Sequence, residues 1–303
     1  MTTLITGAGG LIGMAVRALL QVRGEPVLAV DVTRHGRDDP ALHEIGLNET
    51  ERLQVLAQAE GVNAIVHCGA ISGPMLAKGR PLDIVDANIA GTAAMLELAR
   101  ALPVRRLVFC SSISVYGDAG AATLDETRPL HPSSVYAASK IAGEALVHAY
   151  AAEYGVDGVS LRIGRVYGPY RRANCGLKAM IEDARAGRVS VIPCTHDFPY
   201  HYVWVGDVAQ AIAACLDTPA LPARVYNVGS GEVLTMPEIA ELAVTVLPEL
   251  QVTLIPGADD VPDVQTHFPV TRIAADLGFR PQFGLAEGLR AYAKALPEPM
   301  PVG

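Results

Sequence analysis

The sequence places a tyrosine and a lysine four residues apart, at Tyr136 and Lys140. On a helix this spacing is about one turn, so both side chains project from the same face. A tyrosine has an ordinary pKa of about 10, which is too high for a general base at neutral pH. A neighbouring ammonium favours the phenolate and lowers that pKa. The pair is therefore suited to take the proton of an alcohol during its oxidation; the alternative is an exposed Tyr–Lys pair on a helix.

A serine pair, Ser111-Ser112, follows the apolar run Leu107–Cys110. We expect this run to be a parallel strand, and parallel strands carry ligand contacts at their carboxyl ends. The Ser112 hydroxyl would then hold the substrate oxygen beside Tyr136, although a strand-end serine can also simply bond the backbone. The candidate catalytic residues are Ser112, Tyr136 and Lys140.

A glycine-rich segment, Thr6–Gly13 (TGAGGLIG), lies between an apolar run and an amphipathic helix pattern. Gly7 permits a tight turn, Gly10 lets the backbone approach a pyrophosphate, and Gly13 lets the helix pack closely on the strand. The start of the helix presents free N–H groups and a positive dipole end to phosphates. In this strand–loop–helix context the segment predicts a dinucleotide site rather than an ordinary loop. Its candidate contacts are Gly7, Gly9, Gly10, Leu11, Ile12 and Gly13.

Asp31 ends the second apolar run, 18 residues after Gly13. A carboxylate at this place accepts hydrogen bonds from the ribose hydroxyls of NAD and repels the 2′-phosphate of NADP. We therefore expect NAD as the cofactor, with Arg34 as a residue that would soften this preference. The alternative is an aspartate in a strand-end turn.

The elements that position these residues alternate along the first two-thirds of the chain. Strand-like apolar runs occur at Leu4–Ile5, Val27–Val30, Ala64–His67, Leu107–Cys110 and Val159–Ile163. Helix-like segments occur between them at Leu11–Val22, Glu49–Ala59, Ile84–Ala101 and Ser134–Tyr154. Such alternation predicts an α/β fold, a Rossmann-type doubly wound parallel sheet with helices on both faces.

After about Gly168 many prolines separate shorter elements. We expect residues 1–168 to form the NAD-binding Rossmann domain, and residues 169–303 to be mostly a smaller C-terminal substrate-binding lobe. Some segments near residues 200–230 would return to the sheet. Val225–Val228 is one predicted returning strand, and Pro237–Val246 is a predicted helix with proline in its first turn.

The composition excludes several classes of function. The net charge is −8 and no run is rich in lysine and arginine, so a nucleic-acid partner is not expected. No apolar stretch reaches the roughly 18 residues of a membrane span. The first residues show no secretory signal, so we expect a cytoplasmic protein. The five cysteines form no CxxC spacing, and the histidines His196, His201 and His267 form no ligand pair, so we expect no metal.

With these motifs the chain resembles the extended short-chain dehydrogenase/reductase family, the group of NAD-dependent epimerases and dehydratases. The resemblance covers most of the chain. Besides the glycine loop, Asp31, Ser111-Ser112 and Tyr136–Lys140, it depends on these further segments along the chain: His67–Ala70, Asn88–Thr92, Val115–Gly117, Leu161-Arg162, Val166–Pro169, Val205–Val208, Tyr226–Gly231 and Leu277–Pro281.

The resemblance implies further roles. Cys68, Gly69 and Ala70 would line the adenosine and pyrophosphate of NAD, and Asn88 would support the geometry of the active site. Tyr136 and Lys140 would also contact the cofactor. Members of the family commonly dimerise through the helix with the Tyr-x-x-x-Lys pair and the helix before it, so the resemblance implies a homodimer.

The chain also departs from the family pattern. Gly46–Glu49 replaces an aspartate-containing run that binds adenine, and Leu47 is our candidate contact there. Members that act on sugar nucleotides usually carry asparagine where this chain has Arg165. They also carry an Arg-Asp-Phe segment, which clamps the substrate pyrophosphate, where this chain has Tyr200–Tyr202. A second family arginine, near Asp260–Asp263, is absent too. A buried diphosphate without a paired cation is costly, so these losses argue against a nucleotide sugar.

Arginines near the predicted substrate site suggest a different substrate. Arg165 and Arg171 follow the Val159–Ile163 run, and a guanidinium suits a carboxylate. We therefore take both as candidate substrate-binding residues, the alternative being solvated loop charges. Ile113 and Ser114 stand where dehydratases carry an acidic pair, so a dehydratase is not expected.

These residues and the resemblance are compatible with three functions. The leading hypothesis is an NAD-dependent oxidoreductase that transfers hydride between NAD and a hydroxyl of a small sugar or sugar acid. The alternative is a nucleotide-sugar epimerase, similar to UDP-glucose 4-epimerase, with tightly bound NAD. A non-catalytic NAD(P)-sensing protein is disfavoured because Tyr136 and Lys140 are both present.

Overall fold

The protein is described from a computed structural model, which covers residues 2–73, 75–172, 175–258 and 263–296. The strands of its main sheet are β1 (Thr2–Thr6), β2 (Val27–Asp31), β3 (Leu42–Glu44), β4 (Val62–His67), β5 (Arg106–Ser112), β7 (Gly158–Ile163) and β11 (Val225–Val228). They pair in the order β11-β7-β5-β4-β1-β2-β3, and every pairing is parallel. The predicted doubly wound parallel sheet is therefore confirmed.

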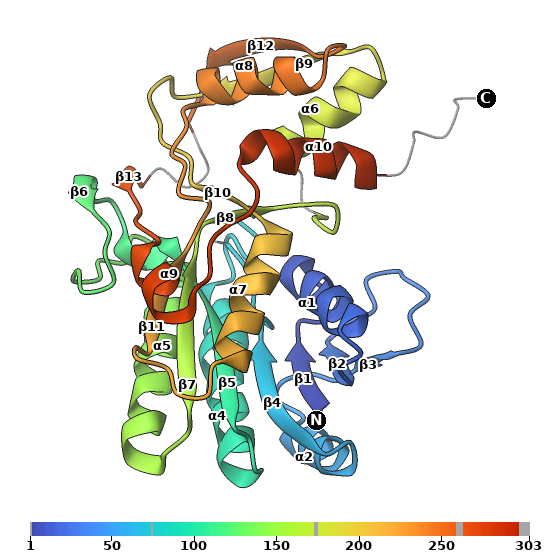
Figure 1. Cartoon of the computed structure of the whole chain (residues 1–303), viewed down its shortest axis with the longest axis vertical. Coiled ribbons are helices and arrows are strands. Elements are labelled where there is room, and N and C mark those ends of the chain that lie inside the picture. Colours follow the sequence, from blue (N-terminus) through green and yellow to red (C-terminus); the bar gives the residue numbers. More distant parts are fainter. Residues whose placement is uncertain (1, 74, 173–174, 259–262, 297–303) are drawn as a thin grey trace.

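Helices cover both faces of this sheet (Figure 1). Their bounds are α1 (Leu11–Val22), α2 (Thr50–Ala59), α4 (Gly91–Ala101), α5 (Val135–Tyr154), α7 (Val205–Asp217) and α9 (Thr271–Leu277). One apolar core lies under α1, α7 and α9, and a second lies under α2, α4 and α5. The central strands β5 and β7 are buried along their whole length, because both of their faces are covered.

The remaining elements lie above the carboxyl ends of the strands in Figure 1. They are α6 (Gly176–Arg185), β9 (Val189–Cys194), α8 (Met236–Val246), β12 (Gln251–Pro256) and α10 (Leu285–Ala295), with the short strands β8 (Arg165–Tyr167), β10 (Tyr202–Trp204), β6 (Gly120–Thr123) and β13 (Gln265–His267). α6, α8, α10 and β9 share a third apolar core. The pairs β8–β10, β9–β12 and β6–β13 are separate from the main sheet. The boundary predicted at residue 168 stays a prediction.

Several local predictions are confirmed and others are wrong. Val225–Val228 is β11 and joins the main sheet as predicted, and Gly24 adopts a left-handed conformation after α1. The predicted helix Ile84–Ala101 is not continuous: α3 (Pro81–Ile84) leads into a π-helical segment, Val85–Ala90, before α4. Glu49 occupies the cap position of α2, and no side chain caps that helix.

The helix with the Tyr–Lys pair is fixed at both ends by local chemistry. The Ser134 hydroxyl accepts a hydrogen bond from the Ala137 backbone N–H at 3.1 Å, which caps α5 at its start. Such a cap contributes about 1 kcal/mol. Gly155 ends the helix with φ of 70°, a left-handed conformation that glycine adopts without strain.

In the described part of the chain, none of the helices combines the length and apolar character that crossing a bilayer requires.

Candidate active site and cofactor cradle

The strand order reverses between β1 and β4, and ligands of open parallel sheets bind in the crevice beyond the strand ends at such a reversal. The glycine loop follows β1 and Cys68–Ala70 follows β4, so the two segments meet there. A Cβ on Gly7, whose φ is +63°, would lie 2.7 Å from the Gly69 nitrogen. A Cβ on Gly13 would lie 2.2 Å from the Gly7 oxygen. At Gly7 the glycine loop packs backbone against backbone on the loop after β4, and at Gly13 the start of α1 packs in the same way on the glycine loop. A side chain at Gly7 or Gly13 would disrupt this packing.

The first turn of α1 is open to an anion. Gly10 is the cap residue, and no side chain caps the helix there. The N–H groups of Leu11, Ile12 and Gly13 stand at this positive end of the helix. A side chain at Gly10 would also meet the Gly7 oxygen at 3.1 Å. This glycine cradle at an uncapped helix start fits the diphosphate of a dinucleotide.

Asp31 lies at the end of β2 beside the glycine loop. Its Oδ2 accepts a hydrogen bond from the Gly9 N–H at 3.0 Å, and the Nε2 of His35 lies 3.2 Å from the same oxygen. Among the described residues, His35 is the only non-glycine with positive φ, at 55°. Arg37 donates to the Gly9 oxygen at 2.7 Å, while Arg34 pairs with Glu44 at 3.3 Å. The carboxylate is thus placed as predicted, and the sequence reasoning missed the contacts of His35 and Arg37.

A buried histidine on β4 joins that strand to β1 and to α4 beside the cradle. The Nδ1 of His67 lies 2.7 Å from Thr6 Oγ1, and its Nε2 lies 3.1 Å from Thr92 Oγ1. Burial lowers the pKa of His67 to about 3, with the nearby Lys140 charge acting in the same direction, so the ring is neutral. Thr6 Oγ1 also accepts from the Gly69 N–H at 3.1 Å. The contacts fix the loop after β4 relative to β1.

Asn88 lies in the π-helical segment and positions two neighbouring elements. Its Oδ1 accepts from the Ile71 N–H at 2.8 Å, and its Nδ2 donates to the Ser139 hydroxyl at 2.9 Å. It therefore connects the loop after β4 with α5, and π-helical turns often occur at functional sites. Leu47 packs against the start of α4, since a Cβ on Gly91 would lie 2.7 Å from its Cδ1.

The three candidate catalytic residues are all buried at the carboxyl end of β5. Ser112 is the last residue of that strand, and its hydroxyl accepts from the Ser114 N–H at 3.2 Å. Tyr136 is 8% exposed and Lys140 is 4% exposed, both on the inner face of α5. The Lys140 Nζ lies 5.9 Å from the centre of the Tyr136 ring. The spacing of the Tyr–Lys pair thus brings the two side chains to one place, as expected.

Burial is the largest influence on the pKa values of both members of this pair. Burial raises the pKa of Tyr136, and a hydrogen bond with Ser112 acts in the opposite direction. Burial also lowers the pKa of Lys140 to about 8. The lysine donates to the Cys110 backbone oxygen at 2.8 Å rather than to the tyrosine. In the chain without a nucleotide, burial is the largest influence on the pKa of Tyr136, and the lowering predicted for the working site stays a prediction.

A buried polar network supports the site from below. Arg162 on β7 pairs with Glu144 of α5 at 2.8 Å, and the Ser111 hydroxyl donates to Glu144 at 2.5 Å. Arg162 also donates to the Tyr116 hydroxyl at 2.9 Å, which donates to Asn227 of β11 at 2.7 Å. The network joins α5 to β5, β7 and β11. Sequence reasoning missed it, because the partners are far apart along the chain.

The candidate substrate residues have defined surroundings. Arg165 lies opposite Tyr202 in the β8–β10 pair, and its guanidinium lies over the rings of Tyr200 and Phe198, at 5.0 and 5.7 Å from their centres. The Arg171 Nη1 donates to the Val166 oxygen at 2.9 Å. Arg165 is thus held beside the Tyr200–Tyr202 stretch, while Arg171 braces the backbone of its own loop.

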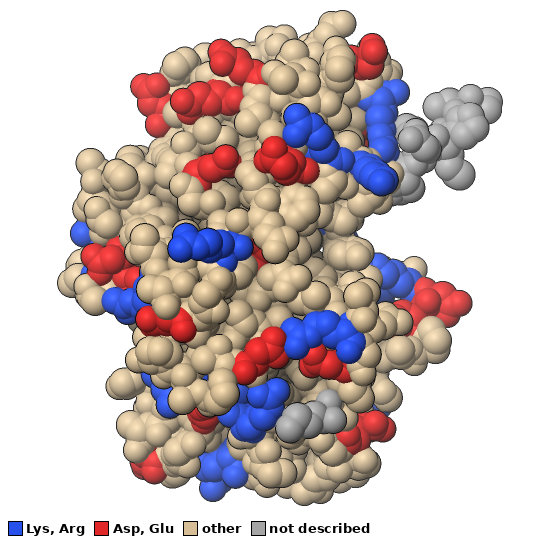
Figure 2. Space-filling model, in the orientation of Figure 1, with Lys and Arg blue, Asp and Glu red and all other residues tan. Residues whose placement is uncertain are grey.

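The remaining features considered in the sequence are the Asp260–Asp263 segment, a metal site and the surface charge. Of Asp260–Asp263, only Asp263 lies within the described residues, where it accepts from the Ser133 hydroxyl at 2.6 Å. Within the described ranges, no group of three or more acidic, histidine or cysteine side chains is arranged to hold a metal. Figure 2 shows acidic and basic side chains mixed over the visible face.

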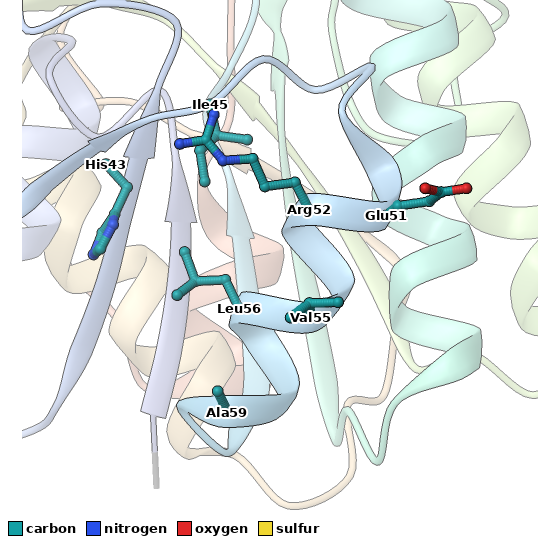
Figure 3. Close-up of a pocket in the computed structure, with 7 residues that line it drawn as sticks. All are labelled: His43, Ile45, Glu51, Arg52, Val55, Leu56 and Ala59. Carbon is teal, nitrogen blue, oxygen red and sulfur yellow. The ribbon is translucent and has the colours of Figure 1, made fainter.

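An apolar hollow of about 450 Å³ lies away from the strand ends, between β3 and α2 (Figure 3). Its lining residues are His43, Ile45, Glu51, Arg52, Val55, Leu56 and Ala59. None of them is a candidate catalytic or cofactor residue, so this hollow is separate from the cradle.

Comparisons with known proteins agree with this geometry. Residues 3–229 match the family described as NAD dependent epimerase/dehydratase. The chain is 29% identical to UDP-glucuronate 4-epimerase 5 of Arabidopsis thaliana, over 97% of this chain and 75% of that protein. It is 31% identical to UDP-glucose 4-epimerase of Mycolicibacterium smegmatis, over 95% and 96%. The solved UDP-glucose 4-epimerase of Thermus thermophilus in complex with NAD has a TM-score of 0.86 and 27% identity, with 97% and 98% covered.

Proposed function

The chain belongs to the NAD-dependent epimerase/dehydratase family, and from that premise we propose that it is a 4-epimerase of a UDP-sugar. It is an NAD-dependent enzyme, as the family and its relatives are. The substrate proposal is supported by relatives that match nearly the whole chain and are UDP-glucuronate and UDP-glucose 4-epimerases. The observation that carries it is the burial of Ser112, Tyr136 and Lys140 together beside the dinucleotide cradle.

The cofactor would lie across the ends of β1, β2 and β4. The N–H groups at the start of α1 would bind its diphosphate, and Asp31 would accept from its adenosine ribose. Cys68, Gly69 and Ala70 would line the other side, with Leu47 near the adenine. When bound, NAD supplies the nicotinamide that takes a hydride from the sugar and returns it to the opposite face.

The chain's own residues would handle the proton. Tyr136 would take the proton of the sugar hydroxyl at its Oη and return it after the hydride transfer. Ser112 would orient that hydroxyl, because its side chain already bonds Tyr136. Lys140 would leave the Cys110 oxygen, hold the nicotinamide ribose and favour the phenolate. The nearby positive nicotinamide would act on the pKa of Tyr136 in the same direction.

A second candidate is an NAD-dependent dehydrogenase of a free sugar or sugar acid. It is favoured by one observation: Tyr200, His201 and Tyr202 stand where a diphosphate-binding arginine is expected. However, the Arg165 guanidinium lies over Tyr200, so a cation still adjoins this stretch. Its contact with a substrate diphosphate or carboxylate stays a prediction, as does that of Arg171. The homodimer and the cytoplasmic location likewise stay predictions.

The substitution Tyr136→Phe tests the proposed proton transfer. We expect epimerisation of the preferred UDP-sugar to fall by about 10²- to 10⁴-fold, while NAD binding is retained. The matched control is Tyr150→Phe, which removes a hydroxyl from the same helix where it bonds Glu97. Turnover is followed by chromatography of the sugar epimers, and NAD by release from the denatured protein. Near-normal turnover of Tyr136→Phe would remove the tyrosine from its assigned role.

A further inference from the structure

Two thiols meet at the floor of the cofactor cradle. Cys68 follows β4 directly and Cys110 lies in β5, and the pairing of His67 with Phe109 sets the two cysteines opposite each other. Their sulfur atoms are 3.5 Å apart. Neighbouring strands are about 4.8 Å apart, which lies within the Cα separations of about 4.4–6.8 Å that disulfides span. The backbone is therefore already spaced for a bridge, and the proposed reaction uses neither thiol.

The surroundings of the pair favour thiol chemistry. The hydrogen bond between the two thiols lowers the pKa of Cys110, and the Lys140 ammonium acts in the same direction. The same hydrogen bond and burial raise the pKa of Cys68, which is the member of the pair that is partly exposed. Cys110 is 5% exposed. The Cys110 sulfur is therefore the better nucleophile of the pair, and it lies next to a residue that is partly exposed.

We propose that Cys68 and Cys110 are an oxidisable dithiol site, and that their disulfide closes the cradle to NAD. A hydroperoxide would be the oxidant. The Cys110 thiolate attacks a peroxide oxygen, the O–O bond breaks, and the departing hydroxide takes up a proton and leaves as one water, giving a sulfenic acid on Cys110. The Cys68 thiol then displaces the hydroxyl, which takes the Cys68 proton and leaves as a second water while the S–S bond forms. In sum, two thiols lose two electrons and hydrogen peroxide becomes two waters.

The packing explains why the bridge would affect the cofactor. The two sulfurs must approach from 3.5 Å to about 2.05 Å. The backbone of Cys68 and Gly69 lies against Gly7, where an added Cβ would meet atoms at 2.7–2.8 Å. This contact has no free space, so a shift of Cys68 is passed to the glycine loop. Conversely, a dinucleotide over Gly69 would cover Cys68; this step depends on the proposed position of the cofactor.

The test treats the nucleotide-free chain with hydrogen peroxide, alkylates it under denaturing conditions and identifies linked peptides by mass spectrometry. We expect a peptide pair joined through Cys68 and Cys110 that a thiol reductant separates. Oxidation should lower NAD affinity by about tenfold or more, and saturating NAD should slow the formation of the bridge. Absence of the linked pair, or a bridge that leaves NAD affinity unchanged, would overturn the proposal.

Two variants sharpen this test. Cys110→Ala should keep its NAD affinity after peroxide treatment, because no bridge can form. Cys175→Ser is the matched control, since Cys175 occupies the cap position of α6, which serine favours, and the linked pair should still form. Should Cys110→Ala fail to fold, the linked peptide of the unaltered chain and its reversal still decide the proposal. None of these measurements uses UDP-sugar turnover, so their failure is distinguishable from failure of the proposed reaction.

Discussion

Lys140 is buried at a cost in stability, and the substitution Lys140→Met measures that cost. Burial moves the pKa of its ammonium from 10.5 to about 8. Each pH unit between the folded and unfolded pKa values corresponds to about 1.4 kcal/mol. At neutral pH the charged lysine therefore destabilises the fold by about 3 kcal/mol. Methionine loses the bond to the Cys110 oxygen, which costs about 1 kcal/mol. The net expectation is a variant more stable by about 2 kcal/mol at about pH 7.

The pH dependence gives the sign of the effect. Between the two pKa values the unfolded chain binds more protons than the folded chain, so the stability of the unaltered protein rises with pH. The full stability of the unaltered chain is reached above the unfolded pKa and is lost as the pH falls through the folded value of about 8. We therefore expect the advantage of Lys140→Met to shrink by about 2 kcal/mol between about pH 7 and about pH 9.5.

The assay is urea unfolding of the nucleotide-free chain at both pH values, with the free energy of unfolding obtained by linear extrapolation. The control is Lys178→Met on α6, whose amino group pairs with Glu182 at 3.5 Å near the surface. It should change stability by less than about 1 kcal/mol at either pH. A Lys140→Met variant that is less stable at neutral pH, or an advantage that does not shrink as the pH rises, would refute the reasoning.

Three further predictions concern the network, the cofactor and the substrate. Glu144→Ala leaves the Arg162 guanidinium buried without its partner and should cost about 3–5 kcal/mol in urea unfolding, whereas Glu97→Ala in an exposed pair should cost less than about 1 kcal/mol. Asp31→Ala should weaken NAD binding by about 10- to 100-fold in titration calorimetry and shift preference toward NADP; an unchanged preference would contradict the ribose contact. Arg165→Ala should lower kcat/KM for UDP-glucuronate more than for UDP-glucose, and equal losses would exclude a carboxylate contact.

The parts of the fold that could be predicted are those with a strong local signal. β5 reads as an unbroken apolar run over Leu107–Cys110 because both of its faces are buried. The Tyr136–Lys140 spacing and the glycine loop also predict their own geometry, since one helix or one turn contains all of their residues. By contrast, the π-helical turn at Val85–Ala90 interrupts a helix whose apolar pattern is continuous, so no sequence signal indicated it.

The residues that could not be predicted act through partners far away in the chain. Glu144 and Arg162 are ordinary charged residues until β7 and α5 bring them together. His35 reaches Asp31 only through a left-handed backbone that sequence rarely reveals for a residue other than glycine. Spacing likewise shows the distance between Tyr136 and Lys140 but not how deeply both are buried, so it does not reveal that burial dominates their pKa values in the chain without a nucleotide.

The proposed reaction epimerises a UDP-sugar and returns the NAD of the protein to the oxidised state. The most direct test incubates the purified protein with UDP-glucuronate and, separately, with UDP-glucose, without added NAD, and resolves the 4-epimers by proton NMR. Free glucuronate and glucose with added NAD are followed in parallel by the absorbance of NADH. We predict that the 4-epimer of at least one UDP-sugar accumulates to equilibrium without net NADH. Net NADH from a free sugar or sugar acid, with no epimer from either UDP-sugar, would contradict the claim and establish the dehydrogenase instead.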